Sequence, residues 1–246
     1  MNSPIPGDTN DVSLAFRIGY NADAGSPISD IILGFGRQVD PDDVEPECLP
    51  SDIWGVQLVR QSEADLTGCR GIRDEEWVKE VALDYIEGYF ANPDHPTTTI
   101  GIGTSNANYP WGCEDLSWRE GGRAWRALIE DIAGVAQPYE SRIFVRSAID
   151  IESWNDEFDD GWVPCGDAAI VWFDAFEGRS GLRFTMNFGS DAFNERPDQW
   201  TRRQVYDVFS GRTTALAYPQ IYCDNTVTAD DWAQYARFFS GMYFLG

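Results

Sequence analysis

Apolar residues along the chain fall into two alternating patterns. Continuous apolar runs bounded by glycine or polar residues are typical of strands that are buried on both faces. Segments whose apolar residues recur every three to four positions are typical of helices. The strands predicted in this way are DIILGFGRQ (30–38), TTTIGIGTSN (97–106), RIFVRSAIDIE (142–152), LRFTMNFGSD (182–191), TTALAYPQIYC (213–223) and GMYFLG (241–246), with IWGVQLVRQ (53–61) as an edge strand or hairpin.

Helices are predicted between these strands, over residues 74–90, 121–134, 200–211 and 228–240. The first has acidic residues in its first turn, which suit the positive end of the helix dipole. The segment CGDAAIVWFDAFEG (165–178) is apolar almost throughout, so its pattern fits a strand or a helix. Because parallel neighbouring strands need a long crossover between them, we expect a helix here.

Strands that alternate with helices predict an α/β fold with a parallel sheet, either closed into a (β/α)8 TIM-type barrel or open and doubly wound. The strand at 142–152 has one apolar face and one mixed polar face, which consists of Phe144, Arg146, Asp150 and Glu152. A polar face suits a barrel lumen better than a sheet covered on both sides, so we favour the barrel. Six firm strands are fewer than eight, so either the N-terminal arm and the segment IWGVQLV (53–59) supply the rest, or the barrel is irregular.

The domain organisation expected from these patterns is simple. Residues 1–29, with one possible strand at VSLAFRIGY (12–20), are expected to form an N-terminal arm. Residues 30–246 are expected to form a single barrel domain, because barrels of about 250 residues often stand as one domain.

The net charge of the chain limits the kinds of partner that it is expected to bind. Forty-one Asp and Glu residues against 18 Lys and Arg residues give a formal net charge of -23. Such a charge repels a phosphate backbone, so we expect no nucleic-acid partner. No apolar run approaches the ~18 residues of a membrane-spanning helix, and the first ten residues lack the basic and apolar regions of a signal peptide. We expect no membrane insertion.

Two carboxylates end the strand at 142–152. Asp150 and Glu152 are two residues apart and therefore point the same way, about 6.6 Å apart along the strand. The C-terminal ends of barrel strands carry the active site, and a proton donor beside an ionised carboxylate is what glycoside hydrolysis requires. The alternative is structural: Asp150 or Ser153 caps a short helix that begins at Trp154, and Glu152 is solvated.

Polar and aromatic residues near neighbouring strand ends are candidates for holding a sugar. The polar ones would donate or accept hydrogen bonds, Asp191 or Tyr218 would orient the substrate, and the tryptophans would stack on sugar faces. The alternative is that these residues close turns and pack loops. The candidates are Asn106, Trp111, Trp154, Asn187, Asp191, Tyr218, Gln220 and Tyr222.

Other kinds of chemistry find little support. The only histidine, His95, lies in a proline-bracketed turn before a strand and thus opposite the candidate site, which disfavours His-dependent catalysis and His-ligated metals. No glycine-rich phosphate-binding motif is present, so we expect no nucleotide cofactor. The acidic loop at 40–47 lacks the ligand spacing of a calcium site and is expected to be solvated, and we expect no metal.

The five cysteines show no C-x-x-C spacing, so disulfides are the better expectation, with buried free thiols as the alternative. A Cys48–Cys69 bridge would close the acidic excursion. A Cys113–Cys165 bridge would tie adjacent loops. An odd count leaves at least one thiol over.

The segments ILGFGR, IGIGTSN, AIDIESW, MNFGS and AYPQIY, spread over residues 30–246, resemble the glycoside-hydrolase-like (β/α) barrels of secreted bacterial proteins. The D-x-E at a strand end is similar to that of Chalaropsis-type muramidases and of chitinase-like barrels. The resemblance implies Glu152 as proton donor, Asp150 as its partner, and an extracellular or cell-surface location. Val145 and Ala148 stand where the chitinase pattern D-x-x-D-x-D-x-E has its first two acids, and ILGFGR ends in Arg37 where the muramidase type has an aspartate.

We therefore expect an extracellular carbohydrate-active barrel that hydrolyses a glycan, such as peptidoglycan, by carboxylate acid–base chemistry and without a cofactor. The alternative, from another class, is a catalytically inactive barrel that acts as a glycan-binding or cell-surface structural protein, because a fold does not confer activity.

Overall fold

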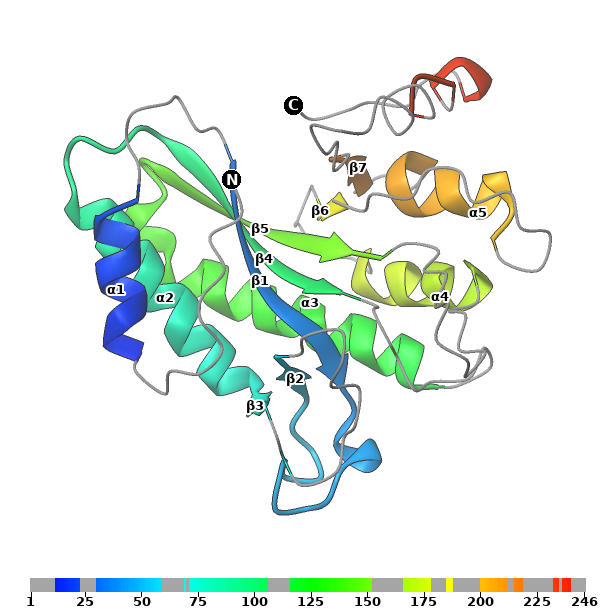
Figure 1. Ribbon diagram of the computed structural model, residues 1–246, viewed down its shortest axis with the longest axis horizontal. Helices are drawn as coiled ribbons and strands as arrows, with labels where there is room; N and C mark the ends of the chain where they lie inside the picture. The colour runs from blue at the N-terminus through cyan, green and yellow to red at the C-terminus, as the bar shows by residue number, and fades with distance from the viewer. Residues whose placement is uncertain are drawn as a thin grey trace. The chain divides into compact units, whose positions relative to one another are not determined.

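The protein forms an α/β fold with a seven-stranded, mostly parallel sheet that alternates with helices (Figure 1). The computed structural model describes residues 12–22, 30–58, 69, 71–105, 116–151, 166–177, 185–187, 200–211, 215–218, 232–234 and 236–239. The strand order is β3-β2-β1-β4-β5-β6-β7. The predicted alternation of strands and helices is confirmed.

The strands are β1 (Asp30–Val39), β2 (Gly55–Gln57), β3 (Ile72–Asp74), β4 (Thr98–Ser105), β5 (Ile143–Asp150), β6 (Thr185–Asn187) and β7 (Ala215–Ala217). The helices are α1 (Val12–Tyr20), α2 (Glu75–Ala91), α3 (Ser117–Val135), α4 (Gly166–Glu177) and α5 (Arg202–Tyr206), which continues into the π-helical turn η4 (Asp207–Gly211). The short 3-10 turns η1 (Pro41–Asp43) and η3 (Gln137–Tyr139) follow β1 and α3.

Tertiary contacts divide the chain into two compact units. The first comprises residues 1–104 and 124–148, and the second residues 105–123 and 149–246. The division cuts α3 near its middle and β5 near its C-terminal end, so both elements contribute to both units.

In the first unit, α2 begins where Asp74 accepts a hydrogen bond from the backbone N–H of Trp77 at 2.8 Å, an N-cap that satisfies one free N–H of the first turn. One face of α2 is buried, including Val78, Val81 and Tyr85. The ring of Trp77 packs edge-on against Phe35 of β1, with 6.1 Å between centroids. The helix predicted at 74–90 is confirmed.

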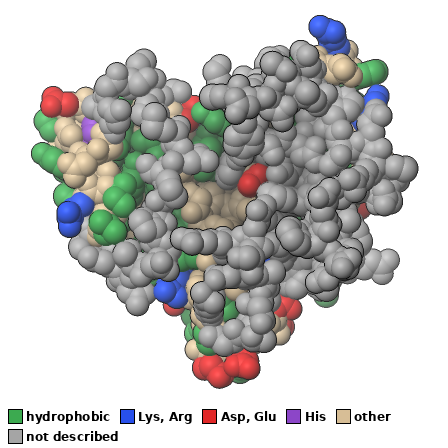
Figure 2. Space-filling model, in the orientation of Figure 1, with side chains coloured by type: hydrophobic (Ala, Val, Ile, Leu, Met, Phe, Trp, Pro, Cys, Tyr) green, Lys and Arg blue, Asp and Glu red, His purple; other side chains and the backbone are tan. Residues whose placement is uncertain are grey.

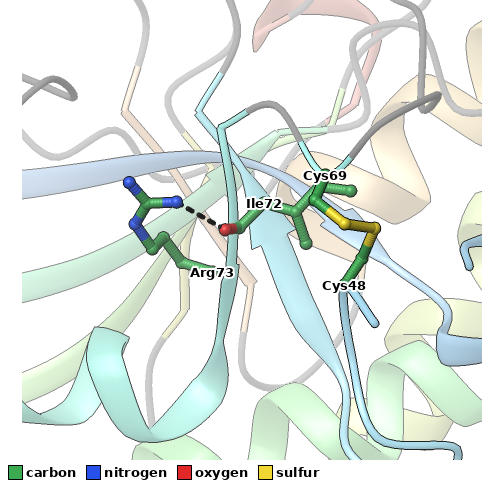
Figure 3. Close-up of a disulfide and its surroundings, with 4 residues drawn as sticks. All are labelled: Cys48, Cys69, Ile72 and Arg73. Atoms are coloured by element: carbon green, nitrogen blue, oxygen red, sulfur yellow. Dashed lines mark hydrogen bonds between the residues drawn. A yellow bond between two sulfur atoms is a disulfide. The ribbon is translucent and has the colours of Figure 1, made fainter. Parts of the chain in front are cut away.

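β1, β2 and β3 form an antiparallel edge of the sheet, as predicted for an edge strand or hairpin. Gly36 has a positive φ of 79°, and a Cβ at this position would overlap the carbonyl oxygen of Gln57. Beside this edge, Cys48 and Cys69 form a disulfide, which confirms that predicted pair (Figure 3). Cys48 also packs against a small buried cluster of Val39, Leu49 and Ile72.

The possible strand at VSLAFRIGY is wrong, because these residues form α1. α1 packs against α2 through small residues, which lets the two backbones approach closely. A Cβ at Gly19 would overlap the carbonyl oxygen of Tyr85, and a Cβ at Gly88 would overlap that of Phe16. The N-terminal segment is thus a docked helix within the first unit.

In the second unit, the ambiguous segment 165–178 contains helix α4, as topology predicted. The start of α3 lies close to α4, since a Cβ at Gly122 would overlap the carbonyl oxygen of Trp172. α5 begins with a capping box in which Thr201 and Gln204 exchange side-chain and backbone hydrogen bonds. Phe209 of η4 packs against Trp232, with 4.8 Å between ring centroids.

Two strands are shorter than predicted within the described residues. The segments 182–191 and 213–223 contribute the three-residue strands β6 and β7, which pair in parallel. The predicted strand at 241–246 and the predicted disulfide between Cys113 and Cys165 lie outside the described residues.

Candidate functional site

β5 has the two faces that its sequence predicts. Ile143, Val145 and Ile149 are buried, whereas Phe144 on the opposite face is 44% exposed. Arg146 and Asp150 share the face of Phe144 and are half-buried. Asp150 is the last residue of the strand, so its carboxyl group belongs to the C-terminal edge of the sheet, where the predicted chemistry requires it.

In the first unit, a buried arginine lies near the C-terminal end of β1. Arg37 of β1 is 2% exposed and donates from Nε and Nη2 to Oε1 of Gln57, its cross-strand partner, at 2.9 and 2.5 Å. The hydroxyl of Thr104 donates to the carbonyl oxygen of Gly36 at 3.0 Å. Sequence patterns assign Arg37 no role, since it only stands where the muramidase type has an aspartate. The sequence feature that could have indicated this buried polar pair is an arginine within the otherwise apolar run of a predicted strand.

Asn187 is predicted from the sequence to bind substrate, but its side-chain amide forms hydrogen bonds with the main chain. It is fully buried, its Nδ2 donates to the carbonyl oxygen of Ile151 at 2.9 Å, and its Oδ1 accepts from the backbone N–H of Ile151 at 3.3 Å. Nδ2 also lies 3.5 Å from the carbonyl oxygen of Val208. Asn187 therefore fixes the backbone directly after Asp150.

We expect Asn187→Ala to lower the free energy of unfolding by about 2–4 kcal/mol, because it leaves the buried N–H and C=O of Ile151 without their partner at ~1–3 kcal/mol each. Urea denaturation measures this. The matched control is Asn21→Ala, whose exposed side chain donates only to the carbonyl oxygen of Arg17, with an expected loss below about 0.5 kcal/mol. If Asn187→Ala left stability unchanged but weakened glycan binding, Asn187 would instead be a substrate-binding residue.

Tyr218 follows β7, and its backbone N–H donates to the carbonyl oxygen of Asn187 at 2.8 Å. Its side chain is half-buried. The structure therefore brings three of the predicted site residues, Asp150, Asn187 and Tyr218, to the ends of β5, β6 and β7. The other predicted site residues lie outside the described residues: Asn106, Trp111, Glu152, Trp154, Asp191, Gln220 and Tyr222.

His95 is buried in the turn before β4. Its Nδ1 lies 3.1 Å from the carbonyl oxygen of Tyr89, and its Nε2 lies 2.8 Å from that of Ala22. These contacts tie the ends of α1 and α2 together. His95 is thus engaged at the N-terminal end of β4, away from the strand ends that carry the candidate site.

Exposed acidic side chains gather at the lower end of the view in Figure 2, over the segment after β1. They are Asp42, Asp43, Glu45, Glu47 and Asp52. Among the described residues, no group of three or more His, Cys, Asp or Glu side chains has a geometry that could hold a metal ion. In the same part of the chain, no helix is long and apolar enough to cross a membrane.

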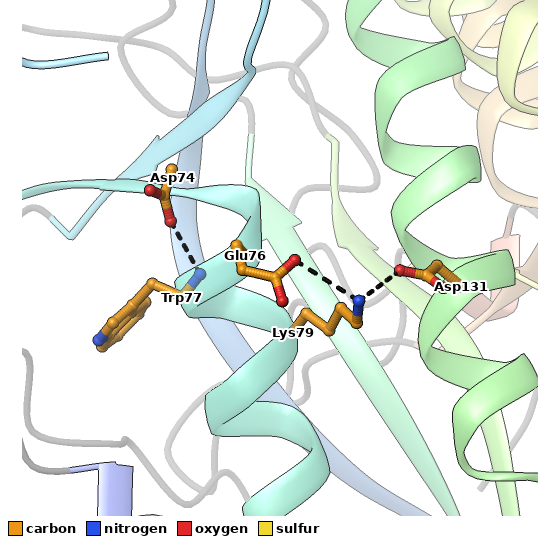
Figure 4. A network of polar contacts seen from close by, with 5 residues as sticks. All are labelled: Asp74, Glu76, Trp77, Lys79 and Asp131. Atoms are coloured by element: carbon orange, nitrogen blue, oxygen red, sulfur yellow. Dashed lines mark hydrogen bonds and ion pairs between the residues drawn. The ribbon is translucent and has the colours of Figure 1, made fainter. Parts of the chain in front are cut away.

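A small hollow in the first unit is lined by Gln38, Trp54, Glu75 and Trp125, among others. Burial, followed by the neighbouring acids Asp74 and Glu76, raises the pKa of Glu75. Lys79 points elsewhere: its Nζ lies 2.8 Å from Asp131 and 3.5 Å from Glu76 (Figure 4). The hollow has a volume of about 10 Å³, far below the ~300–1,000 Å³ of ligand pockets, so we do not place the candidate site here.

Comparison with known proteins adds no relative from which a role could be carried over. No family model matches the chain, and neither the curated proteins nor the solved structures contain a significant match.

Proposed function

We propose that the protein is an extracellular (β/α) barrel that hydrolyses a glycan, such as peptidoglycan, with Glu152 as general acid and Asp150 as its carboxylate partner. The single observation that carries this proposal is the place of Asp150, half-buried at the C-terminal end of β5 on the face opposite Ile149 and Ile151, which are fully buried.

The order of the strands supports closure into a barrel. The strands that follow one another as β1, β4, β5, β6 and β7 are also neighbours in the sheet, with α2, α3, α4 and α5 between them in the chain. Right-handed crossovers in one constant direction place successive helices on the same face, as in a barrel. A doubly wound sheet would instead reverse its strand order at a switch point.

The chemistry follows from the strand direction. A strand continued by two residues beyond Asp150 would carry the carboxyl of Glu152 on the same face, about 6.6 Å further along. One carboxyl group would protonate the leaving glycosidic oxygen, while the other stabilises the positive charge that develops on the sugar or orients the reacting group. The Cys48–Cys69 disulfide supports a location outside the cytoplasm, where such bonds persist.

One observation favours the alternative, an inactive barrel that binds glycans or serves as a cell-surface component. Asp150 is the only acid within β5, and Val145 and Ala148, at the positions of two further acids in the chitinase pattern, are 6% and 0% exposed. Because these two positions are apolar and buried, the strand can hold at most two of the four acids in the chitinase pattern.

The test is turnover of a glycan panel that includes peptidoglycan. We expect wild-type protein to release reducing ends, and Glu152→Gln to lower the rate by about 10²–10⁴-fold, the contribution of a general acid. Asp150→Asn should lower it as well. The matched controls are Glu130→Gln on α3 and Asp94→Asn before β4, both exposed, which should retain full activity.

A wild-type protein that hydrolyses no glycan on the panel would rule out the enzyme and leave the binding alternative. Full activity in Glu152→Gln would refute the assignment of the general acid, even if the protein proves to be a hydrolase.

A further inference from the structure

Arg146, on the polar face of β5, has no acidic partner in the part of the chain that the structure describes. Arg146 is half-buried, and its Nη1 donates to the carbonyl oxygen of Val145 at 3.0 Å. Among the described residues, its guanidinium makes no other hydrogen bond and no ion pair. Since the chain has 41 acidic residues against 18 basic ones, the lack of a carboxylate beside this cation is unusual.

The energetics agree with this geometry. Burial lowers the pKa of Arg146, and no acidic neighbour opposes that shift. A guanidinium that loses water without gaining a counter-ion destabilises the fold. Such a cost is typical of residues retained for binding, where the missing partner is the ligand.

Glycines neighbour Arg146 on its own face of the sheet. The backbone N–H of Thr98 donates to the carbonyl oxygen of Arg142 at 2.9 Å, so in parallel register Gly101 of β4 lies beside Arg146. Further along β4, Gly103 is buried, and a Cβ there would lie 3.2 Å from the carbonyl oxygen of Leu33 on β1. Gly34 on β1 is exposed, and a Cβ there would meet nothing within 4 Å. Glycines thus line this face of β1 and β4.

Within β5 itself, Phe144 precedes Arg146 by two residues, lies on the same face and is 44% exposed. The face therefore combines exposed backbone at Gly34, a partly exposed aromatic ring and one cation with donors that the described residues do not use, all within the first unit. Backbone and ring can contact the flat apolar side of a sugar, and the guanidinium can bind a carboxylate through two parallel hydrogen bonds.

We infer that Arg146 is a specificity-determining residue that binds the carboxylate of an acidic glycan. This inference rests on the proposed function and names its substrate class: a saccharide that carries a uronic-acid or carboxyalkyl group. The net charge of -23 repels anions at long range, so discrimination for the carboxylate must come from this short-range contact.

The test compares carboxylated glycans with uncharged forms of the same skeleton by titration calorimetry. The pairs are galacturonate oligosaccharides and their methyl esters, hyaluronan oligosaccharides and their carboxyl-reduced forms, and muramic-acid-containing peptidoglycan fragments before and after amidation. We expect wild-type protein to bind the charged member of at least one pair at least about tenfold more tightly, an effect typical of a charged hydrogen bond.

Three variants separate the possible roles of Arg146. Arg146→Gln should lose the preference for the charged glycan and keep its affinity for the uncharged form. Arg146→Lys should keep only part of the preference, because a lysine is charged but lacks the two-pronged geometry. The matched control Arg123→Gln, exposed on α3, should change neither affinity. A structural arginine would lower the melting temperature when replaced, whereas we expect Arg146→Gln to leave it unchanged or raise it.

Equal affinity of the wild type for charged and uncharged forms, or no binding of either, would overturn the inference. So would a preference that survives in Arg146→Gln. If Arg146→Gln does not fold, the test rests on Arg146→Lys. A preference for the charged glycan as strong in Arg146→Lys as in the wild type would contradict the two-pronged contact. The affinities do not depend on turnover. A lack of hydrolase activity would therefore refute the proposed function, whereas this inference is tested by the affinities alone.

Discussion

Gly88→Ala should destabilise the first unit by about 3 kcal/mol. The added methyl group would overlap the carbonyl oxygen of Phe16 on α1, and the nearby atoms in this contact are backbone, which cannot rotate away. α1 and α2 would have to move apart, and overpacking of this kind costs typically ~1–3 kcal/mol. Thermal unfolding should therefore show a melting temperature lower by about 6–12 °C, at ~2–4 °C per kcal/mol for a chain of this size.

The matched control is Gly134→Ala on α3, where a Cβ would meet nothing within 4 Å. There the same substitution should raise stability by up to about 1 kcal/mol, because alanine is a better helix former than glycine. Equal effects of the two substitutions would contradict the close approach of α1 and α2. Protease cleavage near residue 20 in Gly88→Ala, but not in the control, would show that α1 has separated.

Removal of the disulfide is the second large expected effect. Cys48 and Cys69 are 21 residues apart in the chain, and a loop of this length constrains the unfolded state by about 3 kcal/mol in the chain-entropy treatment. Cys48→Ser with Cys69→Ser should lower the melting temperature by about 6–12 °C. The loss should include the small cluster of Val39, Leu49 and Ile72 beside the bridge.

Salt and reductant provide the controls for this prediction. Reduction of the wild type should reproduce the loss seen in the double variant and should have a smaller effect on that variant. Of the five exposed acids in Figure 2, Asp52 lies inside the enclosed segment, and the other four directly precede Cys48. These acids repel one another once the constraint is gone. Added salt screens this repulsion and should restore part of the stability. A double variant as stable as the wild type would show that the segment is held by its buried cluster alone.

Local patterns were sufficient for the long elements. α2, β4, α3 and β5 lie where periodicity predicts them, because each buries one continuous apolar face against neighbours from the same sheet. The ambiguous segment at 165–178 needed one further argument, the crossover that parallel strands require, and is helical as expected.

The segment at 12–20 shows where local patterns mislead. Its larger apolar residues alternate with small or polar ones, which is the period of a strand. In α1, however, the buried contact is made by Ala15 and Gly19, four residues apart, against α2. The contact residues are small because the helices are close, and small residues give almost no hydrophobic signal.

Chain pattern alone predicted which face of β5 is apolar and that Asp150 lies near the end of this strand, because these depend on spacing along the sequence. It also suggested the Cys48–Cys69 pair, which the structure contains. The tertiary structure decided what the polar groups bind. Asn187 satisfies the backbone of Ile151, and Arg37 binds Gln57 across strands, whereas Arg146 forms no ion pair with an acid in the described part of the chain. A hydrogen bond or ion pair depends on which groups the fold brings within about 3 Å, and sequence spacing carries no such distance.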